Sequence, residues 1–195
     1  MVSDVGKQIL AGLAETRRFF GQISVLVQTV DGMLGEAGWE CVSTNKCTDI
    51  TSHILRSQQW MPQSIYRFYR LADSEGAEVG KDIALFLGVL LGEEQPQIGF
   101  LEPWLTFGLH QFATGHSMQG IKYNEWIQPL ENQHNPDGGF QSENLGNNPQ
   151  ENDGLVHYSV AAVTLFSIQN SEDLNSKVIA PLLKRFQNKV EEQEI

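Results

Sequence analysis

The hydrophobic positions of this chain keep a helical period through the first 35 residues. Positions that recur at alternating steps of four and three lie on one side of an α-helix, and here they are Ile9, Leu13, Thr16, Phe20, Ile23, Val27, Val30 and Leu34. Further apolar residues widen this seam, so the pattern predicts one long helix over residues 1–35 that buries two sides. Such a helix is about 45 Å long. One small core does not cover that length, and part of the helix is expected to pack on a second copy.

Residues 60–112 show the shorter period of β-strands. The segment Ser64 to Leu71 alternates its side chains and is rich in aromatic residues, and Trp104 to Phe112 follows the same pattern. Between them, Ile83 to Leu91 has no polar face, which predicts a central strand covered on both sides. The connections are too short for crossover helices, so these strands are expected to form an antiparallel meander. A short strand over Trp39 to Val42 is also expected.

The last third of the chain combines a polar segment, a strand and a helix. Residues 129–154 are rich in Asn, Gly and Gln and longer than an ordinary connection, so they predict either a plain connecting loop or a binding loop. Residues 155–168 alternate like a strand, and residues 171–190 form a helical stripe with Ser171 as the expected N-cap. Pro181 is expected to kink or restart that helix.

This order of elements predicts a single α+β domain over residues 1–195. It consists of a long N-terminal helix, a mostly antiparallel sheet of four to five strands and a C-terminal helix. By topology only, the layout resembles profilin-like or GAF-like folds, in which terminal helices flank a sheet. The resemblance implies a fold and no activity, because fold alone does not determine function.

Charge and composition exclude several functions. The chain carries 24 acidic and 13 basic residues, a net charge of −11. This charge disfavours nucleic acid and anionic membranes as partners. The start of the chain lacks a secretory pattern, and the longest uncharged apolar run is far shorter than the ~20 residues that span a bilayer. A cytoplasmic protein is expected. Phosphate-loop, dinucleotide and nucleophile-elbow motifs are absent, and no cofactor or metal is expected.

The candidate chemistry lies where the third long strand ends and the last strand begins. If these strands are antiparallel neighbours, His110 and His157 meet at the end of the sheet from which the 129–154 segment emerges. The residues expected to line a ligand site there are His110, His157, Thr106, Ser159, His134 and Asp137. Imidazole groups serve as bases and as metal ligands. Their spacing matches no metal motif, and ordinary packing or surface exposure is the favoured explanation of these histidines.

The cysteines and the arginines allow simpler explanations. Cys41 and Cys47 are compatible with thiols, a disulfide or an incomplete zinc site, and a cytosolic setting favours thiols. Arg67 and Arg70 lie among aromatic residues, yet they point to opposite faces of a regular strand. They therefore cannot form one nucleic-acid-binding patch, and each is expected to pair with an acidic residue.

Two functions remain as hypotheses at this stage. The first is a non-catalytic or regulatory module that binds a small ligand or a protein and acts as a homodimer through the N-terminal helix. The second is a hydrolase or metal-assisted enzyme with a histidine site under the 129–154 segment. A structural role in a larger assembly would use the same exposed helix surface.

Overall fold

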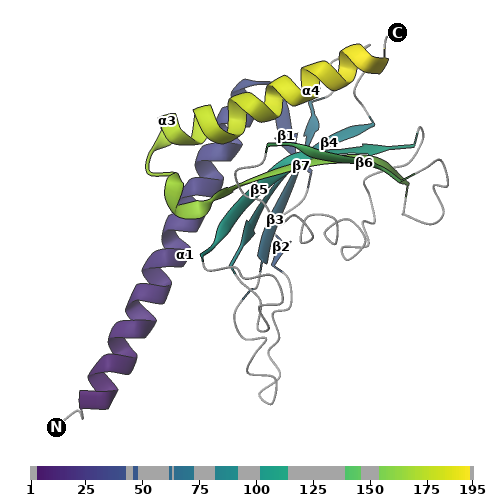
Figure 1. Ribbon diagram of the computed structural model, residues 1–195. Helices are drawn as coiled ribbons and strands as arrows, with labels where there is room; N and C mark the ends of the chain where they lie inside the picture. Colours follow the sequence, from purple (N-terminus) through teal and green to yellow (C-terminus); the bar gives the residue numbers. More distant parts are fainter. Residues whose placement is uncertain are drawn as a thin grey trace.

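A computed structural model shows a long helix, an antiparallel sheet and a C-terminal helical segment, which confirms the α+β layout (Figure 1). The structure describes residues 4–42, 46–47, 62, 64–72, 82–91, 102–113, 139–145 and 154–193. None of the helices in these ranges is both long enough and apolar enough to cross a membrane.

The first helix, α1, spans Asp4–Glu36, close to the expected bounds. Two residues after the helix ends, Gly38 has a φ of 86°, which suits glycine and turns the chain toward the sheet. Only its second half is buried, through Ile23, Val27, Val30 and Leu34. The first half projects away from the body (Figure 1).

The sheet holds more strands than the four to five that the pattern predicted. The strands are β1 (Trp39–Cys41), β2 (Lys46–Cys47), β3 (Ser64–Leu71), β4 (Ile83–Leu90), β5 (Trp104–Phe112), β6 (Gln141–Asn144) and β7 (Leu155–Thr164). Their order is β1-β3-β4-β5-β7-β6, with β2 pairing the same edge of β3 as β1, and every described pairing is antiparallel. The meander β3-β4-β5 is as expected, and every residue of β4 is buried.

Two features at the β7 end of the sheet differ from the expectation. The strand stops at Thr164, and Leu165–Ser167 form a short 3-10 helix. The partner strand β5 explains this end, because β5 begins directly after Pro103. The Pro103 carbonyl accepts a hydrogen bond from the Leu165 amide. Proline has no N–H to donate in return, so the ladder stops there. Strand β6 lies inside the predicted polar segment. Its four residues are exposed and polar, so backbone pairing with β7 creates this strand without a hydrophobic signal.

The C-terminal segment consists of α3 (Ser171–Leu174), a π-helical turn (Asn175–Ile179) and α4 (Ala180–Gln193). The N-cap is Asn170, one residue before the expected Ser171, and its side chain accepts from the Asp173 amide. Pro181, at which the sequence predicted a kink or a restart, is the second residue of α4 and comes just after the π-helical turn. Proline cannot donate to the preceding turn and its ring crowds that turn, and a π-helical turn relieves both problems.

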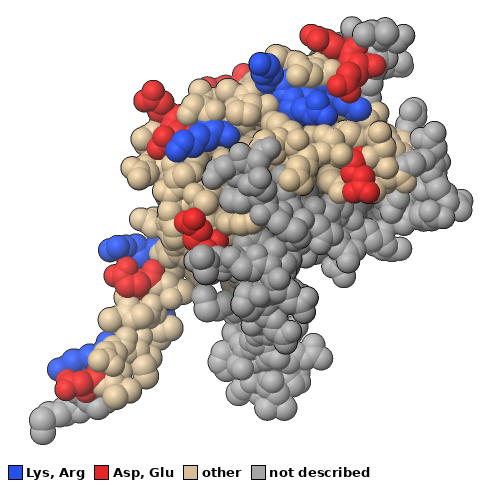
Figure 2. Space-filling model, viewed as in Figure 1, with Lys and Arg blue, Asp and Glu red and all other residues tan. Residues whose placement is uncertain are grey.

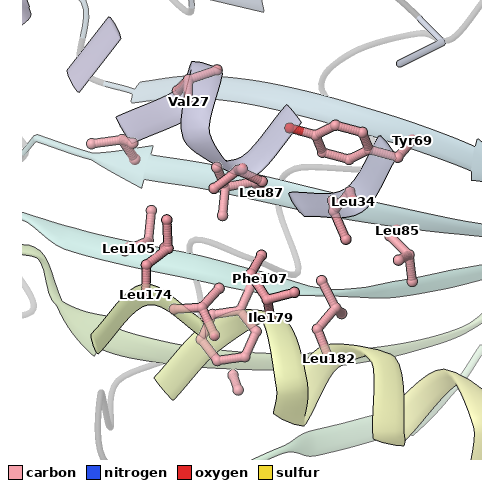
Figure 3. Packing of buried hydrophobic residues seen from close by; sticks show 14 of the residues in the cluster. Val27, Leu34, Tyr69, Leu85, Leu87, Leu105, Phe107, Leu174, Ile179 and Leu182 are labelled. Atoms are coloured by element: carbon pink, nitrogen blue, oxygen red, sulfur yellow. The ribbon is translucent and has the colours of Figure 1, made fainter. Parts of the chain in front are cut away.

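The main core lies between the sheet and the helices (Figure 3). Leu87 and Phe107 of the sheet belong to this core together with Val27 of α1 and Leu182 of α4, so both helices cover the same face of the sheet. The opposite face of the sheet carries a second buried cluster, which contains Tyr66, Phe68, Ala84, Phe86, Leu90, Trp104, Phe112, Leu155, Val160 and Ala162. Both faces of the sheet are therefore apolar and buried, as the pattern of β4 predicted.

Two ion pairs confirm the expected roles of the arginines on β3. Arg67 lies on the helix-covered face and donates two hydrogen bonds to Asp31 of α1, both at 2.6 Å, while the Tyr69 hydroxyl donates to the same carboxylate at 2.9 Å. Arg70 lies on the other face and pairs with Glu40 of β1. The two guanidinium groups thus tie α1 and β1 to β3 and share no surface.

Candidate functional site

The strand register separates the two candidate histidines. Strands β5 and β7 are antiparallel neighbours as expected, and both imidazoles lie at the same end of the sheet. However, His110 is opposite Tyr158, and His157 is opposite Gln111. Residues directly opposite each other share a face, and successive residues alternate faces. His110 and His157 therefore lie on opposite faces of the sheet and cannot act on one ligand from the same side.

His110 lies in an aromatic environment on the face that the helices do not cover. Its ring stacks on Phe86 with the centroids 4.8 Å apart, and the rings of Phe68 and Phe112 lie at 6.0 and 6.3 Å. Burial, and then the neighbouring charge of His157, lower the pKa of His110 to about 3. Thr106 shares this face, is fully buried and donates to the Gly88 carbonyl at 3.3 Å. These two predicted site residues form part of the packed sheet.

His157 lies on the helix-covered face, beside α4. Its Nδ1 is 2.7 Å from the Asn144 Oδ1, and because an amide oxygen only accepts, Nδ1 carries the proton in this arrangement. The side chain is 7% exposed, and its Nε2 has no hydrogen-bond partner within the described residues. Burial, followed by the positive charges of Lys189 and Arg185, lowers its pKa to about 4. At neutral pH this imidazole is an uncharged group beside two cations.

Ser159, the remaining predicted residue in the described strands, is part of a clamp between three elements. The Ser142 hydroxyl of β6 donates to the Ser159 oxygen at 2.8 Å. Arg185 of α4 donates from Nε to Ser159 and from Nη2 to Ser142, each at 3.1 Å, and its Nη1 lies 3.9 Å from the Glu192 carboxylate. All three nitrogens of the guanidinium group thus contact partners in the chain itself. We name Ser142, Ser159 and Arg185 the edge clamp, because they fasten α4 to the edge of the sheet.

We expect the edge clamp to stabilise the C-terminal helix rather than to bind a ligand. Replacing Arg185 by Met keeps most of the aliphatic stem and removes the donors. The free energy of unfolding should then fall by about 1–3 kcal/mol, since charged hydrogen bonds in a partly buried setting are lost. Urea unfolding followed by circular dichroism measures this change. The matched control is the exposed neighbour Lys184→Met, and equal stability of the two variants would contradict the clamp.

Sequence reasoning missed Arg185, Lys189 and Ser142. The signal for the two cations was present, because they follow Leu182 by about one and two helical turns and so border the apolar stripe of α4. Ser142 gave no such signal, since its strand is polar throughout. Two other predicted site residues, His134 and Asp137, lie outside the described residues, as do 129–138 and 146–153 of the polar segment.

No metal centre is found within the described part of the chain, because no three His, Cys, Asp or Glu side chains there are grouped to hold an ion. Cys41 of β1 is a half-buried thiol, in agreement with the state that the sequence favoured.

The second candidate site is an apolar groove beside α1. It lies between the middle of α1 and the segment that joins β7 to α3, with a volume of about 510 Å³. Phe19 and Leu26 line one side, and Leu165 and Phe166 line the other. None of its lining residues is charged, and Phe166 remains 58% exposed. This groove can receive an apolar side chain or helix.

The exposed half of α1 continues from this groove. We name residues 4–18 the arm. Its apolar residues Val5, Ile9 and Leu13 are 64%, 59% and 49% exposed. Val5 and Ile9 lie about five helical turns before the buried Ile23 and Val27, so each pair occupies the same angular position on the helix. The arm therefore extends the seam that packs on the sheet, but carries it beyond the body.

Comparison of the chain with protein-family models, with curated proteins and with solved structures finds no match. By its fold and its candidate sites, the protein is an α+β domain whose first helix projects from the body with an exposed apolar seam.

Proposed function

We propose that this protein is a non-catalytic, regulatory binding module that acts as a homodimer through α1. The observation that carries the proposal is the exposed seam of the arm. A helix that projects into water is normally polar on all sides or ends where its packing ends. Here the apolar positions continue for about four turns past the last contact with the sheet. Covering these side chains would contribute about 1.5–3 kcal/mol each.

The charges favour a second copy of the chain as the partner. The arm contains Lys7, Arg17 and Arg18 against Asp4 and Glu15, a net charge of +1, so the rest of the chain carries −12. Two of these basic residues pair along the helix, Lys7 with Asp4 and Arg18 with Glu15 (Figure 2). Because the arm is slightly positive and the rest of the chain is strongly negative, a second copy meets less electrostatic repulsion at the arm than elsewhere on the chain.

The hydrolase alternative loses its main support from the geometry. It required His110 and His157 to act together, and the register of β5 against β7 puts them on opposite faces. Ser159, which was expected to line the same site, instead belongs to the edge clamp. A binding role at the cytoplasmic location that the composition suggests, with a small ligand or a protein as partner, fits these contacts better.

The proposal predicts that a charge on the seam separates the copies. In Ile9→Glu, two glutamates would have to enter one apolar interface, and each copy loses a buried aliphatic side chain. We expect wild type to have twice the 21.8 kDa mass of one chain, and the variant to dissociate with a dissociation constant at least about 100-fold higher. Light scattering over a dilution series measures both.

The matched control is Ala11→Glu, which adds the same charge two residues later and about 200° around the helix. Ala11 is exposed, and this variant should keep the mass of wild type. A wild-type chain that stays monomeric at high concentration would overturn the proposal, and equal dissociation of both variants would show that charge alone is responsible.

A further inference from the structure

The groove beside α1 and the exposed arm have complementary chemistry within one chain. The groove is uncharged, with aromatic and aliphatic side chains at its base and the polar residues Gln22, Thr29, Gln169, Asn170 and Ser171 along its border. The arm offers a stripe of aliphatic side chains on a helix about 23 Å long. The arm continues without a break into the part of α1 that forms one side of the groove, so it cannot fold back into the groove of its own chain. The arm that fills a groove therefore has to come from another copy.

The direction of the two helices follows from the positions of arm and groove. The groove contacts α1 from Phe19 to Thr29, and the arm begins at Asp4. If two copies of α1 run antiparallel, the first turns of one arm lie beside the groove of the other, and the arrangement is reciprocal. A twofold axis then passes near Leu13, about midway between Val5 and the groove residue Gln22. A parallel pair would leave both grooves empty and place both arms side by side.

Electrostatics favours the same direction. In an antiparallel pair, the two bodies lie at opposite ends of the helix pair, and each carries a net charge of −12 outside its arm. In a parallel pair, the bodies lie at the same end, and the two net charges of −12 lie side by side. Like charges at short distance oppose such a contact.

We propose that the dimer forms by reciprocal exchange of arms, with the helices antiparallel and the Val5–Ile9 turns of each copy seated in the groove of the other. This inference rests on the proposed homodimer and specifies its geometry. Phe19 and Phe166, whose ring centroids are 6.5 Å apart across the groove, form the surface that receives the partner's arm. At Gly12 and Gly21, a Cβ would meet no heavy atom within 4 Å, so these positions leave room for close helix approach.

Disulfide trapping tests the direction of the helices. In a background of Cys41→Ser and Cys47→Ser, one copy carries Val5→Cys and a differently tagged copy carries Gln22→Cys, both near the surface of α1. After mixing and mild oxidation, we expect the mixed disulfide to be the main product and the Val5→Cys copies not to link to each other, because their residues would be about 25 Å apart. Leu13→Cys, near the axis, should link to itself.

The outcomes separate this inference from the homodimer. Self-linking of Val5→Cys without the mixed product means a parallel dimer, which overturns the exchange and leaves the dimer intact. A monomer by light scattering, with no product in any mixture, overturns both. As a second measurement, Phe166→Ser changes a body residue that is already exposed, so it should preserve the fold and raise the dissociation constant about tenfold or more. An unchanged dissociation constant contradicts arm insertion.

Discussion

Replacing Gly108 by Ala should strongly destabilise this protein. A Cβ at position 108 would lie 2.0 Å from the Ser159 carbonyl oxygen and 2.8 Å from the ring of Phe86. The first contact is with backbone of the paired strand β7, which cannot move without breaking the ladder. We expect the free energy of unfolding to fall by at least about 3 kcal/mol, a large part of the ~5–15 kcal/mol that stabilises a typical domain.

Urea unfolding measured against Gly32→Ala provides the comparison. Gly32 lies in the exposed surface of α1 outside the arm, and a Cβ there meets no heavy atom within 4 Å. Alanine favours the helix by about 1 kcal/mol relative to glycine, so this variant should be slightly more stable than wild type. Two variants with the same chemical change should thus shift the urea midpoint in opposite directions. A Gly108→Ala variant as stable as wild type would mean that β5 and β7 do not pair as described.

Acid should destabilise the protein over the range in which its two buried histidines resist protonation. Their pKa values are about 4 for His157 and about 3 for His110, against about 6.5 in an unfolded chain. Between these values the unfolded state binds protons that the folded state does not, so stability falls as pH falls. For His157, the stabilisation that comes from keeping the imidazole neutral is fully present above pH ~6.5 and is lost as the pH falls toward ~4. After allowance for solvent screening, this loss lowers the free energy of unfolding by about 1–3 kcal/mol.

The test compares wild type with His157→Gln at fixed protein concentration from pH 7.5 to pH 4. Carboxylates titrate in both proteins, so the difference between the two unfolding free energies isolates His157. Glutamine can still donate to Asn144 and has no charge to gain. We expect wild type to be more stable at pH 7.5 and to lose that advantage on acidification. Parallel curves over the whole range would show that His157 is protonated as easily in the folded chain as outside it.

The elements that could be predicted from the sequence are those in which the spacing of hydrophobic residues shows directly which residues are buried. The seam of α1 and the fully apolar β4 are of this kind, because each residue's environment follows from its position in one helix or strand. The interruption of the last helix next to Pro181 was also predictable, since it follows from the chemistry of a single residue. Strand β6 was not, because a polar edge strand is held by backbone pairing and needs no apolar face.

The candidate site shows the limit of such reasoning. Parity within β5 correctly grouped His110 with Thr106, and parity within β7 grouped His157 with Ser159. The relation between the two strands depends on their register, and a register that differs by one residue exchanges the faces. The β-bulge between Gln111 and Phe112 shows that the register between β5 and β7 changes within a single residue. Arg185 enters the site from α4, far along the chain, so no pattern within the strands could reveal it.

By itself, therefore, the sequence determined that this chain has a long amphipathic helix, a buried central strand and an acidic surface, since these follow from period and composition. Only the tertiary structure decided that α1 leaves the sheet halfway along its length, that the two imidazoles face opposite sides, and that a groove lies beside the emerging arm. These features depend on where separate elements meet in space, and contacts between distant residues set that arrangement.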